Sequence, residues 1–330
     1  MPFANPKPLS EAFQHQTYVS VHALEAGTLT LPAWQFITPC DRDLRMRKPS
    51  LSFLIQHIDT VGRTTRIVFD LGIRRELRDY PPPLQQHLLT RLPLTTRPDV
   101  RDSIERGALS VQDIDVVILS HVHWDHVGTP TDFSKSQFVV GNGALGVLRS
   151  GGVTHSGKAG HSHFEPNLLP SKRTFELPPI QASEGVESSA FDAQSVGERL
   201  VKAKWRKVLH FQAAIDVFGD ESLFIVNAPG HLEGHVNLLA RLGQKQWVYL
   251  AGDACHDRRL LTGECAIAEW QAASGATCCI HVNKADVERT IADIRQLITH
   301  HADEVEVILA HDADWMDKLD NRDKFWPGKI

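Results

Sequence analysis

The sequence has few cysteines and no excess of positive charge, and each shortage excludes a class of protein. Its five cysteines are an odd number without a CxxC spacing. This argues against a disulfide framework and against a zinc site built from thiolates. A net charge of −5 over 330 residues provides no electrostatic footprint for nucleic acid or for an anionic membrane. We therefore expect no nucleic-acid partner.

Long apolar runs are also missing. No run approaches the ~20 residues that a membrane helix needs, and residues 1–6 lack the basic and apolar regions of a secretory signal. Hydrophobic residues make up 42% of the chain and charged residues 23%, as in an ordinary globular protein. We expect a cytoplasmic protein that has no membrane partner.

Residues 121–126, which read HVHWDH, contain four potential metal ligands. They follow the β-branched run 114–119, which predicts a short buried strand. One histidine after a strand usually only caps it, whereas three histidines and an aspartate favour a metal site. His121 and His123 point the same way in an extended segment, and Asp125 and His126 follow after the chain has turned. Imidazole and carboxylate ligands without a thiolate suit Zn²⁺, with Mn²⁺ and Fe²⁺ as alternatives.

The HVHWDH stretch resembles the HxHxDH motif of the metallo-β-lactamase superfamily. Four further stretches are similar to that family's motifs and stand in the same order, from Ile67 to Asp312. They are the strand and DxG turn ending at Asp70-Leu71-Gly72, the PGHLEGH turn from Pro229 to His235, the strand-end Gly252-Asp253, and the closing strand with His311-Asp312. The resemblance implies an α/β (α+β) fold, the four-layer αββα sandwich. We expect one domain, 1–330, with insertions at 73–112 and 150–210.

The same resemblance implies a site for two divalent metal ions and names its ligands. The first metal is assigned to His121, His123 and His231, the second to Asp125, His126 and His311, and Asp253 bridges the two. Zinc alone can lower the pKa of bound water from about 15.7 to about 7. The implied reaction is therefore attack by a metal-bridging hydroxide, with Asp125 in the catalytic centre. Asp70 and His235 are predicted to orient ligands without binding metal themselves.

The overall pattern is most similar to the acyl-homoserine lactonase-like branch, with one departure. Where those lactonases carry a tyrosine three residues after the bridging aspartate, this chain has His256. A histidine can protonate a leaving nitrogen, which favours a small lactone or γ-lactam as the substrate. His256 either contacts the scissile group, carried past the metals by Ala254 and Cys255, or is a surface histidine in a loop.

Three other functions compete with ring opening. A glyoxalase II-like thioesterase stays open because the basic run 42–48 offers a grip for a thiol carrier. A phosphodiesterase or nuclease is disfavoured by the acidic net charge. A non-catalytic binding module is least favoured, because all seven ligand positions are filled.

Periodicity and turn residues predict the remaining elements. Residues 73–112 either form a wall of the substrate pocket or make a homodimer contact. The stretch from His155 to His163 is predicted to be a polar loop at the pocket mouth and not a further metal site. Residues 32–48 are predicted to be mainly irregular. Strands are expected at 17–24, 51–58, 64–69, 137–140, 215–218, 223–227, 236–242, 246–250 and 304–310, and helices at 84–92, 102–106 and 284–301.

Overall fold

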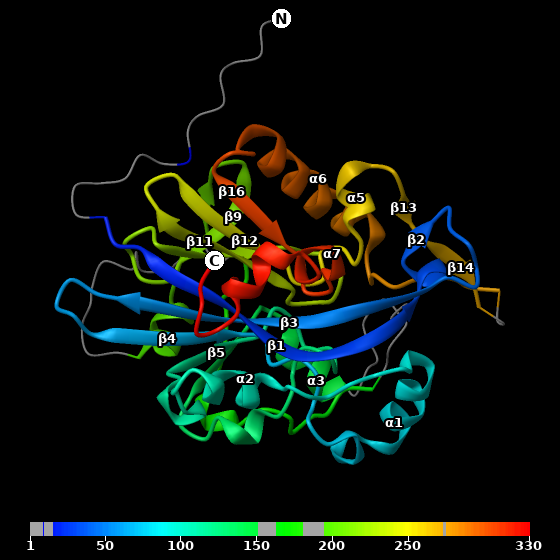
Figure 1. The fold of residues 1–330 in the computed structure, drawn as a ribbon, viewed down its shortest axis with the longest axis horizontal. Helices are drawn as coiled ribbons and strands as arrows, with labels where there is room; N and C mark the ends of the chain where they lie inside the picture. The colour runs from blue at the N-terminus through cyan, green and yellow to red at the C-terminus, as the bar shows by residue number, and fades with distance from the viewer. Residues whose placement is uncertain (1–8, 10–15, 151–162, 181–194, 273–274) are drawn as a thin grey trace, which may run out of the picture.

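The structure is a computed structural model of the chain that describes residues 9, 16–150, 163–180, 195–272 and 275–330. Two large sheets lie in the middle of the molecule, and helices lie beyond each of them (Figure 1). The predicted helix–sheet–sheet–helix arrangement is confirmed.

The first sheet contains six strands among the described residues and joins antiparallel to parallel pairing. β1, β3 and β4 pair antiparallel, and β4 to β7 pair parallel. The strands predicted at 51–58 and 64–69 are confirmed, and they pair as an antiparallel hairpin. In spatial order the strands are β1 (Val19–Pro32), β3 (Arg45–Ile58), β4 (Thr64–Phe69), β5 (Val116–Ile118), β6 (Gln137–Val140) and β7 (Thr174–Glu176).

The second sheet also contains six strands among the described residues, and it is mostly antiparallel. Only β16 departs from this, because it pairs parallel to β12 at one edge. The hairpins predicted around 215–227 and 236–250 are confirmed. In spatial order the strands are β16 (Val305–Ile308), β12 (Gln246–Leu250), β11 (Val236–Gly243), β10 (Leu223–Asn227), β9 (Phe211–Asp216) and β8 (Arg206–Val208).

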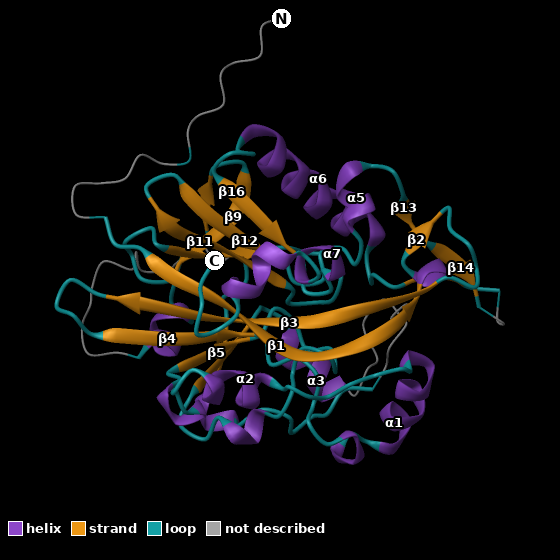
Figure 2. Cartoon of the chain, viewed as in Figure 1, coloured by secondary structure: helices purple, strands orange, loops and turns teal. Residues whose placement is uncertain are grey.

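Helices and two short strand pairs complete the described structure (Figure 2). In the part of the chain that is described, no helix is both long and apolar enough to cross a bilayer. The short pairs are β2 (Ile37–Thr38) with β13 (Ala266–Ile267), and β14 (Glu269–Gln271) with β15 (Thr277–Cys279). The helices are α1 (Pro82–Leu88), α2 (Val100–Arg106), α3 (Ala144–Ser150), α4 (Val196–Leu200), α5 (Arg258–Thr262), α6 (Lys284–His300) and α7 (Ala313–Met316).

The prediction that residues 32–48 are mainly irregular is wrong over its second half. β3 begins at Arg45, and β1 continues to Pro32, so the two strands form one long hairpin. The prolines and the charges of this stretch mask the strand pattern. Pro32 is tolerated because β1 is an edge strand, and Arg45 and Arg47 are tolerated because their side chains are exposed.

Alternating side chains of the central strands divide between two layers of the core. In β5, Val116 and Ile118 face the cluster between the two sheets, whereas Val117 packs in the cluster on the opposite face. In β12, Val248 faces the space between the sheets and Tyr249 faces the cluster that contains α6. Both faces of these strands are therefore buried, which explains their continuous apolar sequence.

Five strands deliver their last residues to one edge of the sandwich. β4 and β5 are parallel, so the chain leaves both at the same rim of the first sheet. β10 and β12 both pair antiparallel to β11, and β16 is parallel to β12, so these three also end together. All five metallo-β-lactamase-like motifs follow one of these strand ends, which brings residues far apart in sequence to a common rim.

The outer helix α6 packs its apolar side on the second sheet. Asn283 caps it by accepting a hydrogen bond from the backbone N–H of Asp286, as the sequence predicts. Ile291, Ile294 and Leu297 belong to the same buried cluster as Tyr249.

Truncating this buried side should destabilise the whole domain. Ile294 is fully buried, so Ile294→Ala should lower the free energy of unfolding by roughly 2–5 kcal/mol. Gln296→Ala, at an exposed position of α6, is the matched control and should change it by less than about 0.5 kcal/mol. Urea denaturation followed by circular dichroism measures both, and equal effects would contradict the assigned packing.

Candidate metal centre

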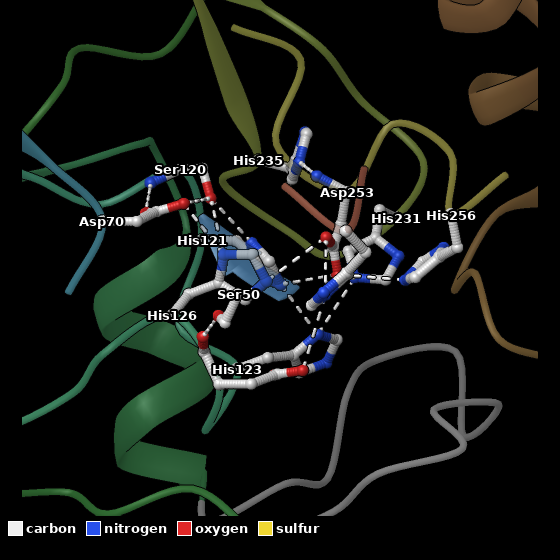
Figure 3. A network of polar contacts seen from close by, with 12 residues as sticks. Ser50, Asp70, Ser120, His121, His123, His126, His231, His235, Asp253 and His256 are labelled. Carbon is white, nitrogen blue, oxygen red and sulfur yellow. Dashed lines mark hydrogen bonds and ion pairs between the residues drawn. The ribbon is translucent and has the colours of Figure 1, made fainter. Parts of the chain in front are cut away.

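The carboxylate of Asp253 lies at the centre of a buried cluster of imidazoles (Figure 3). Its Oδ2 is 3.2 Å from Nε2 of His231 and 3.6 Å from Nε2 of His121. Its Oδ1 is 3.2 Å from Nε2 of His126 and 3.3 Å from Nε2 of His311. Each oxygen therefore faces a different pair of histidines, which is the arrangement that a carboxylate bridging two cations requires.

The first group of side chains consists of three histidines from two loops. Nδ1 of His123 is 2.9 Å from Nε2 of His121 and 3.0 Å from Nε2 of His231. Burial, together with the neighbouring histidines, holds the pKa of all three rings well below the usual value, so the rings are neutral at pH 7. Neutral rings whose nitrogens converge present lone pairs to one another, and a cation between them satisfies those lone pairs. The residues therefore fit a metal ion.

The second group combines a carboxylate with two imidazoles. Ligand atoms of Asp125, His126 and His311 all lie within 4.8 Å of one another, and Oδ2 of Asp125 is 3.6 Å from Nε2 of His311. All three residues are buried. One oxygen and two nitrogen donors form a mixed set that accepts a divalent transition metal. The structure thus brings together all seven residues that the sequence singled out as ligands.

Charge in this centre is concentrated on Asp253 and His126. Burial by itself raises the pKa of the Asp253 carboxyl, but His126, His256 and His311 together hold it well below the usual value. Burial by itself lowers the pKa of His126, yet the carboxylates of Asp253 and Asp70 raise it well above the usual value. The cluster therefore binds positive charge at the position where His126 meets both carboxylates.

Asp70 holds His126 in place from behind. Its Oδ2 lies 2.8 Å from Nδ1 of His126, and its two oxygens accept hydrogen bonds from the backbone N–H and the hydroxyl of Ser120. Asp70 has a φ of +62°, which costs a non-glycine residue about 1–3 kcal/mol. The geometry agrees with the predicted orienting role, and the strain indicates that the position of this carboxylate is demanded by the site.

His235 contacts the backbone beside Asp253. Its Nε2 accepts a hydrogen bond of 3.0 Å from the N–H of Asp253, and its Nδ1 lies 2.9 Å from the carbonyl oxygen of Ala228. Gly252 has a φ of +46°, and a Cβ there would lie only 2.8 Å from Nε2 of His235. The ring therefore sets the position of Asp253 through the main chain, which agrees with the predicted orienting role.

Three orienting contacts have no signature in the sequence. Nδ1 of His311 lies 2.7 Å from the carbonyl oxygen of Pro49, and Ser50 donates a 2.5 Å hydrogen bond to the carbonyl oxygen of Asp125. The ring of His281, which sequence reasoning missed, is buried with its Nδ1 2.9 Å from Nδ1 of His231. His281 belongs to no motif, and only the number of histidines in the chain pointed towards it.

His256 lies beside the carboxylate of Asp253, so the alternative of a surface histidine in a loop is wrong, and its contact with the scissile group stays a prediction. It is buried, and its Nε2 is 3.0 Å from Oδ2 of Asp253. The turn after β12 folds back, so that Ala254 and Cys255 point into the core while His256 returns to the rim. Its ring stacks against that of His311 with centroids 5.5 Å apart.

A cavity opens onto the cluster, and apolar side chains form one part of its wall. His123, Asp125, His231, Asp253, His256 and His311 line it together with Leu29, Leu31, Phe36, Arg91, Trp124 and Ile280. Because Arg91 belongs to residues 73–112, this segment does form part of the pocket wall. A larger cavity of about 460 Å³ follows the turn from Pro229 to Val236, but none of the seven predicted ligands lines it.

His163 is exposed and lines a small pocket beside His123 and Trp124. The other two histidines of the predicted polar loop, His155 and His161, lie outside the described residues.

No family model matches the chain. Among solved structures, a quorum-quenching N-acyl homoserine lactone lactonase superposes with a TM-score of 0.62, at 14% identity over 96% of this chain and 100% of that one. The dizinc lactonase AidC superposes with a TM-score of 0.57, at 11% identity over 99% and 94%. The chain has the metallo-β-lactamase fold. The resemblance noted in the sequence is thereby confirmed.

This metallo-β-lactamase-fold chain spans only part of the length of several curated proteins that resemble it in sequence. The metallo-hydrolase mfmC of Annulohypoxylon moriforme is 29% identical over 74% of this chain and 58% of its own length. The γ-lactamase FDB1 of Fusarium pseudograminearum is 26% identical over 74% and 54%. The cytochrome P450 monooxygenase mpaDE of Penicillium brevicompactum is 26% identical over 94% of this chain, which spans 35% of that protein.

The contact between His235 and Asp253 should make stability depend on pH. Burial lowers the pKa of His235 to about 4. Below about pH 6.5 the histidine therefore becomes protonated in the unfolded chain, whereas the buried ring stays neutral in the folded protein. Because the unfolded state then binds more protons, the free energy of unfolding falls as the pH drops from about 6.5 towards 4.

His235→Asn removes this titrating group. We expect the variant to have a lower melting temperature than the wild type at pH 7. Between pH 7 and pH 4.5, its melting temperature should fall by less than that of the wild type. Thermal melts of chelator-treated protein test this without a contribution from metal release. Identical slopes would show that His235 is not buried in the neutral form.

Proposed function

We propose that this chain is a metal-dependent hydrolase that opens the ring of a small cyclic ester or amide, a lactone or γ-lactam. The observation that carries the proposal is the placement of Asp253, whose two oxygens face two separate sets of histidines. The names of the similar proteins support the same class, because they include a metallo-hydrolase, γ-lactamases and lactonases.

The chain's two donor sets would hold two divalent ions. His121, His123 and His231 would bind one, Asp125, His126 and His311 the other, and Asp253 both. Bound there, such ions supply Lewis-acid polarisation of the scissile carbonyl and acidify water at neutral pH. Zn²⁺ is our first choice, with Mn²⁺ and Fe²⁺ as alternatives, because the donors are nitrogen and oxygen without thiolate.

The protein contributes orientation and a shielded site. Asp70, His281 and the carbonyl oxygen of Pro49 each fix one imidazole of the cluster. Such outer contacts set which ring nitrogen is free to bind a metal. The apolar wall of the cavity excludes water from the carbonyl and strengthens every electrostatic contact made there.

His256 is our candidate for the group that gives a proton to the leaving oxygen or nitrogen. It lines the cavity, and its Nε2 is held by Asp253, while its buried Nδ1 has no hydrogen-bond partner among the described residues. A histidine in such a position can carry a proton to a leaving group near neutral pH.

A glyoxalase II-like thioesterase is the second candidate, and a phosphodiesterase ranks below it. Nothing in the described cavity resembles the row of cations that a phosphodiester backbone requires, since Arg91 is the sole lysine or arginine in its lining. Five unpaired cysteines support a reducing compartment such as the cytoplasm. A homodimer remains a prediction.

The two-metal site predicts a specific pattern of metal loss. Asp253→Ala should remove most of the bound metal, because Asp253 serves both donor sets. His235→Asn should weaken binding by roughly 10–100-fold without abolishing it, because it acts through the backbone. His163→Ala, at an exposed histidine, is the matched control and should retain the wild-type content.

Elemental analysis after gentle purification, repeated after addition of zinc or manganese, measures these contents. A wild-type protein that neither contains nor takes up metal would end the two-metal assignment. Complete metal loss in His235→Asn would make His235 a ligand.

Activity should be confined to ring opening and should depend on His256. A panel of lactones, γ-lactams, β-lactams, thioesters and phosphodiesters tests the substrate class. His256→Ala should lower kcat on the preferred ring by about 10²–10⁴-fold at unchanged metal content, as expected for loss of a general acid. His300→Ala, the same change at an exposed end of α6, should leave kcat unaltered. Turnover of thioesters or phosphodiesters alone would overturn the ring-opening assignment.

A further inference from the structure

Arg91 is a buried cation that none of the roles described above explains. It ends the short 3₁₀ helix Leu89–Arg91, and only 3% of its surface is exposed. Nη1 and Nη2 both donate to the side-chain oxygen of Gln35, each at 3.3 Å. No carboxylate of the described residues lies within 4 Å of this guanidinium. A charge with one neutral acceptor is poorly compensated for its burial.

Three other arginines of the chain show how a guanidinium removed from water is commonly compensated. Burial costs a guanidinium its hydration, and a carboxylate with which it makes a bidentate or close ion pair restores much of that loss. Three such pairs are Arg74 with Glu165 at 2.8 Å, Arg75 with Asp99 at 2.7 Å, and Arg258 with Asp312 at 2.6 Å. Arg91 is more deeply buried than any of these three arginines. Unlike them, it forms no ion pair with a carboxylate of the described residues.

The location of Arg91 shows where the missing partner belongs. Arg91 lines the cavity that contains Asp125 and Asp253, and the neighbouring wall is formed by leucines and aromatic rings. Burial lowers the pKa of Arg91 to about 10, with Asp125 acting in the opposite direction, so the group stays charged at pH 7. Once Asp125 serves a metal ion, its charge is no longer available to the guanidinium.

We propose that Arg91 is a specificity-determining residue that binds an anionic substituent, a carboxylate, on the substrate whose ring is opened at the metal cluster. The planar guanidinium retains free N–H groups, and its fork matches a carboxylate in two parallel hydrogen bonds. Leucine and aromatic side chains beside Arg91 offer apolar contacts to the rest of such a molecule. The assignment rests on the proposed function and narrows it to rings that carry a negative charge.

A matched pair of lactones tests the assignment. Dihydrocoumarin and dihydrocoumarin-6-carboxylate differ only in the anionic group. We expect the metal-loaded wild type to prefer the carboxylate, and Arg91→Gln to reduce that preference in kcat/KM by roughly 10–100-fold, mainly through KM. Arg91→Lys should restore part of the preference. Arg63→Gln is the control for net charge, because Arg63 is exposed and its guanidinium pairs with Asp59 in the turn between β3 and β4; it should leave the preference unchanged.

Binding of benzoate and benzamide, measured by calorimetry at equal metal content, separates this proposal from the proposed function. We expect Arg91→Gln to weaken benzoate by a similar factor and to leave benzamide unaltered. If neither lactone is opened but benzoate still distinguishes the variants, the ring-opening function fails and the anion site stands. If Arg91→Gln changes both lactones and both benzene derivatives equally, or only lowers the melting temperature, Arg91 is structural and the proposal is overturned. If the variant alters product inhibition alone, the guanidinium binds the carboxylate formed by ring opening and the substrate assignment is wrong.

Discussion

A single buried carboxylate determines how the rest of this structure must be arranged. The carboxylate of Asp253 is almost completely removed from water, and its two oxygens approach imidazoles from three separate segments of the chain. An isolated charge at such depth would cost several kcal/mol. It is therefore stable only where positive charge surrounds it on both sides. The two donor sets, their orienting contacts and the apolar wall can all be understood as consequences of that requirement.

The sandwich meets this requirement through strand direction. Strands β4 and β5 end at the same rim as β10, β12 and β16, so five turns converge although Asp70 and His311, in the first and the last of them, are 241 positions apart. Rigid sheets then fix the backbone from which each ligand projects. The positive φ of Asp70 and the close approach of His235 to Gly252 show that the backbone at this rim is locally strained and crowded. The packed strands beneath the rim stabilise this conformation.

The sequence predicted many of the strands, because alternating and continuous apolar runs are local patterns, whereas the layers and the seven candidate ligands were predicted from the resemblance of the strand-end motifs to those of the metallo-β-lactamase superfamily. It failed where the determining contact is distant. His281 belongs to no sequence motif. The contact of His311 with Pro49 is made by a backbone carbonyl, which leaves no pattern in the sequence. The position of His256 beside Asp253 depends on the shape of the turn after β12. The hairpin at Arg45 was missed because Arg45, Arg47 and Lys48 conceal the alternation at the start of β3.

Residues 73–112 contact both the HVHWDH loop and the wall of the cavity. The hydroxyl of Tyr80 accepts a hydrogen bond from the N–H of Arg74 and donates one to the carbonyl oxygen of Trp124, inside the HVHWDH loop. The segment therefore holds the loop that supplies the ligands, and it also presents Arg91 to the cavity. A change in this segment would alter the wall of the cavity, while the strand ends before the seven candidate metal ligands would stay in place. Substrate preference can thus diverge among proteins of this fold while the metal cluster remains the same.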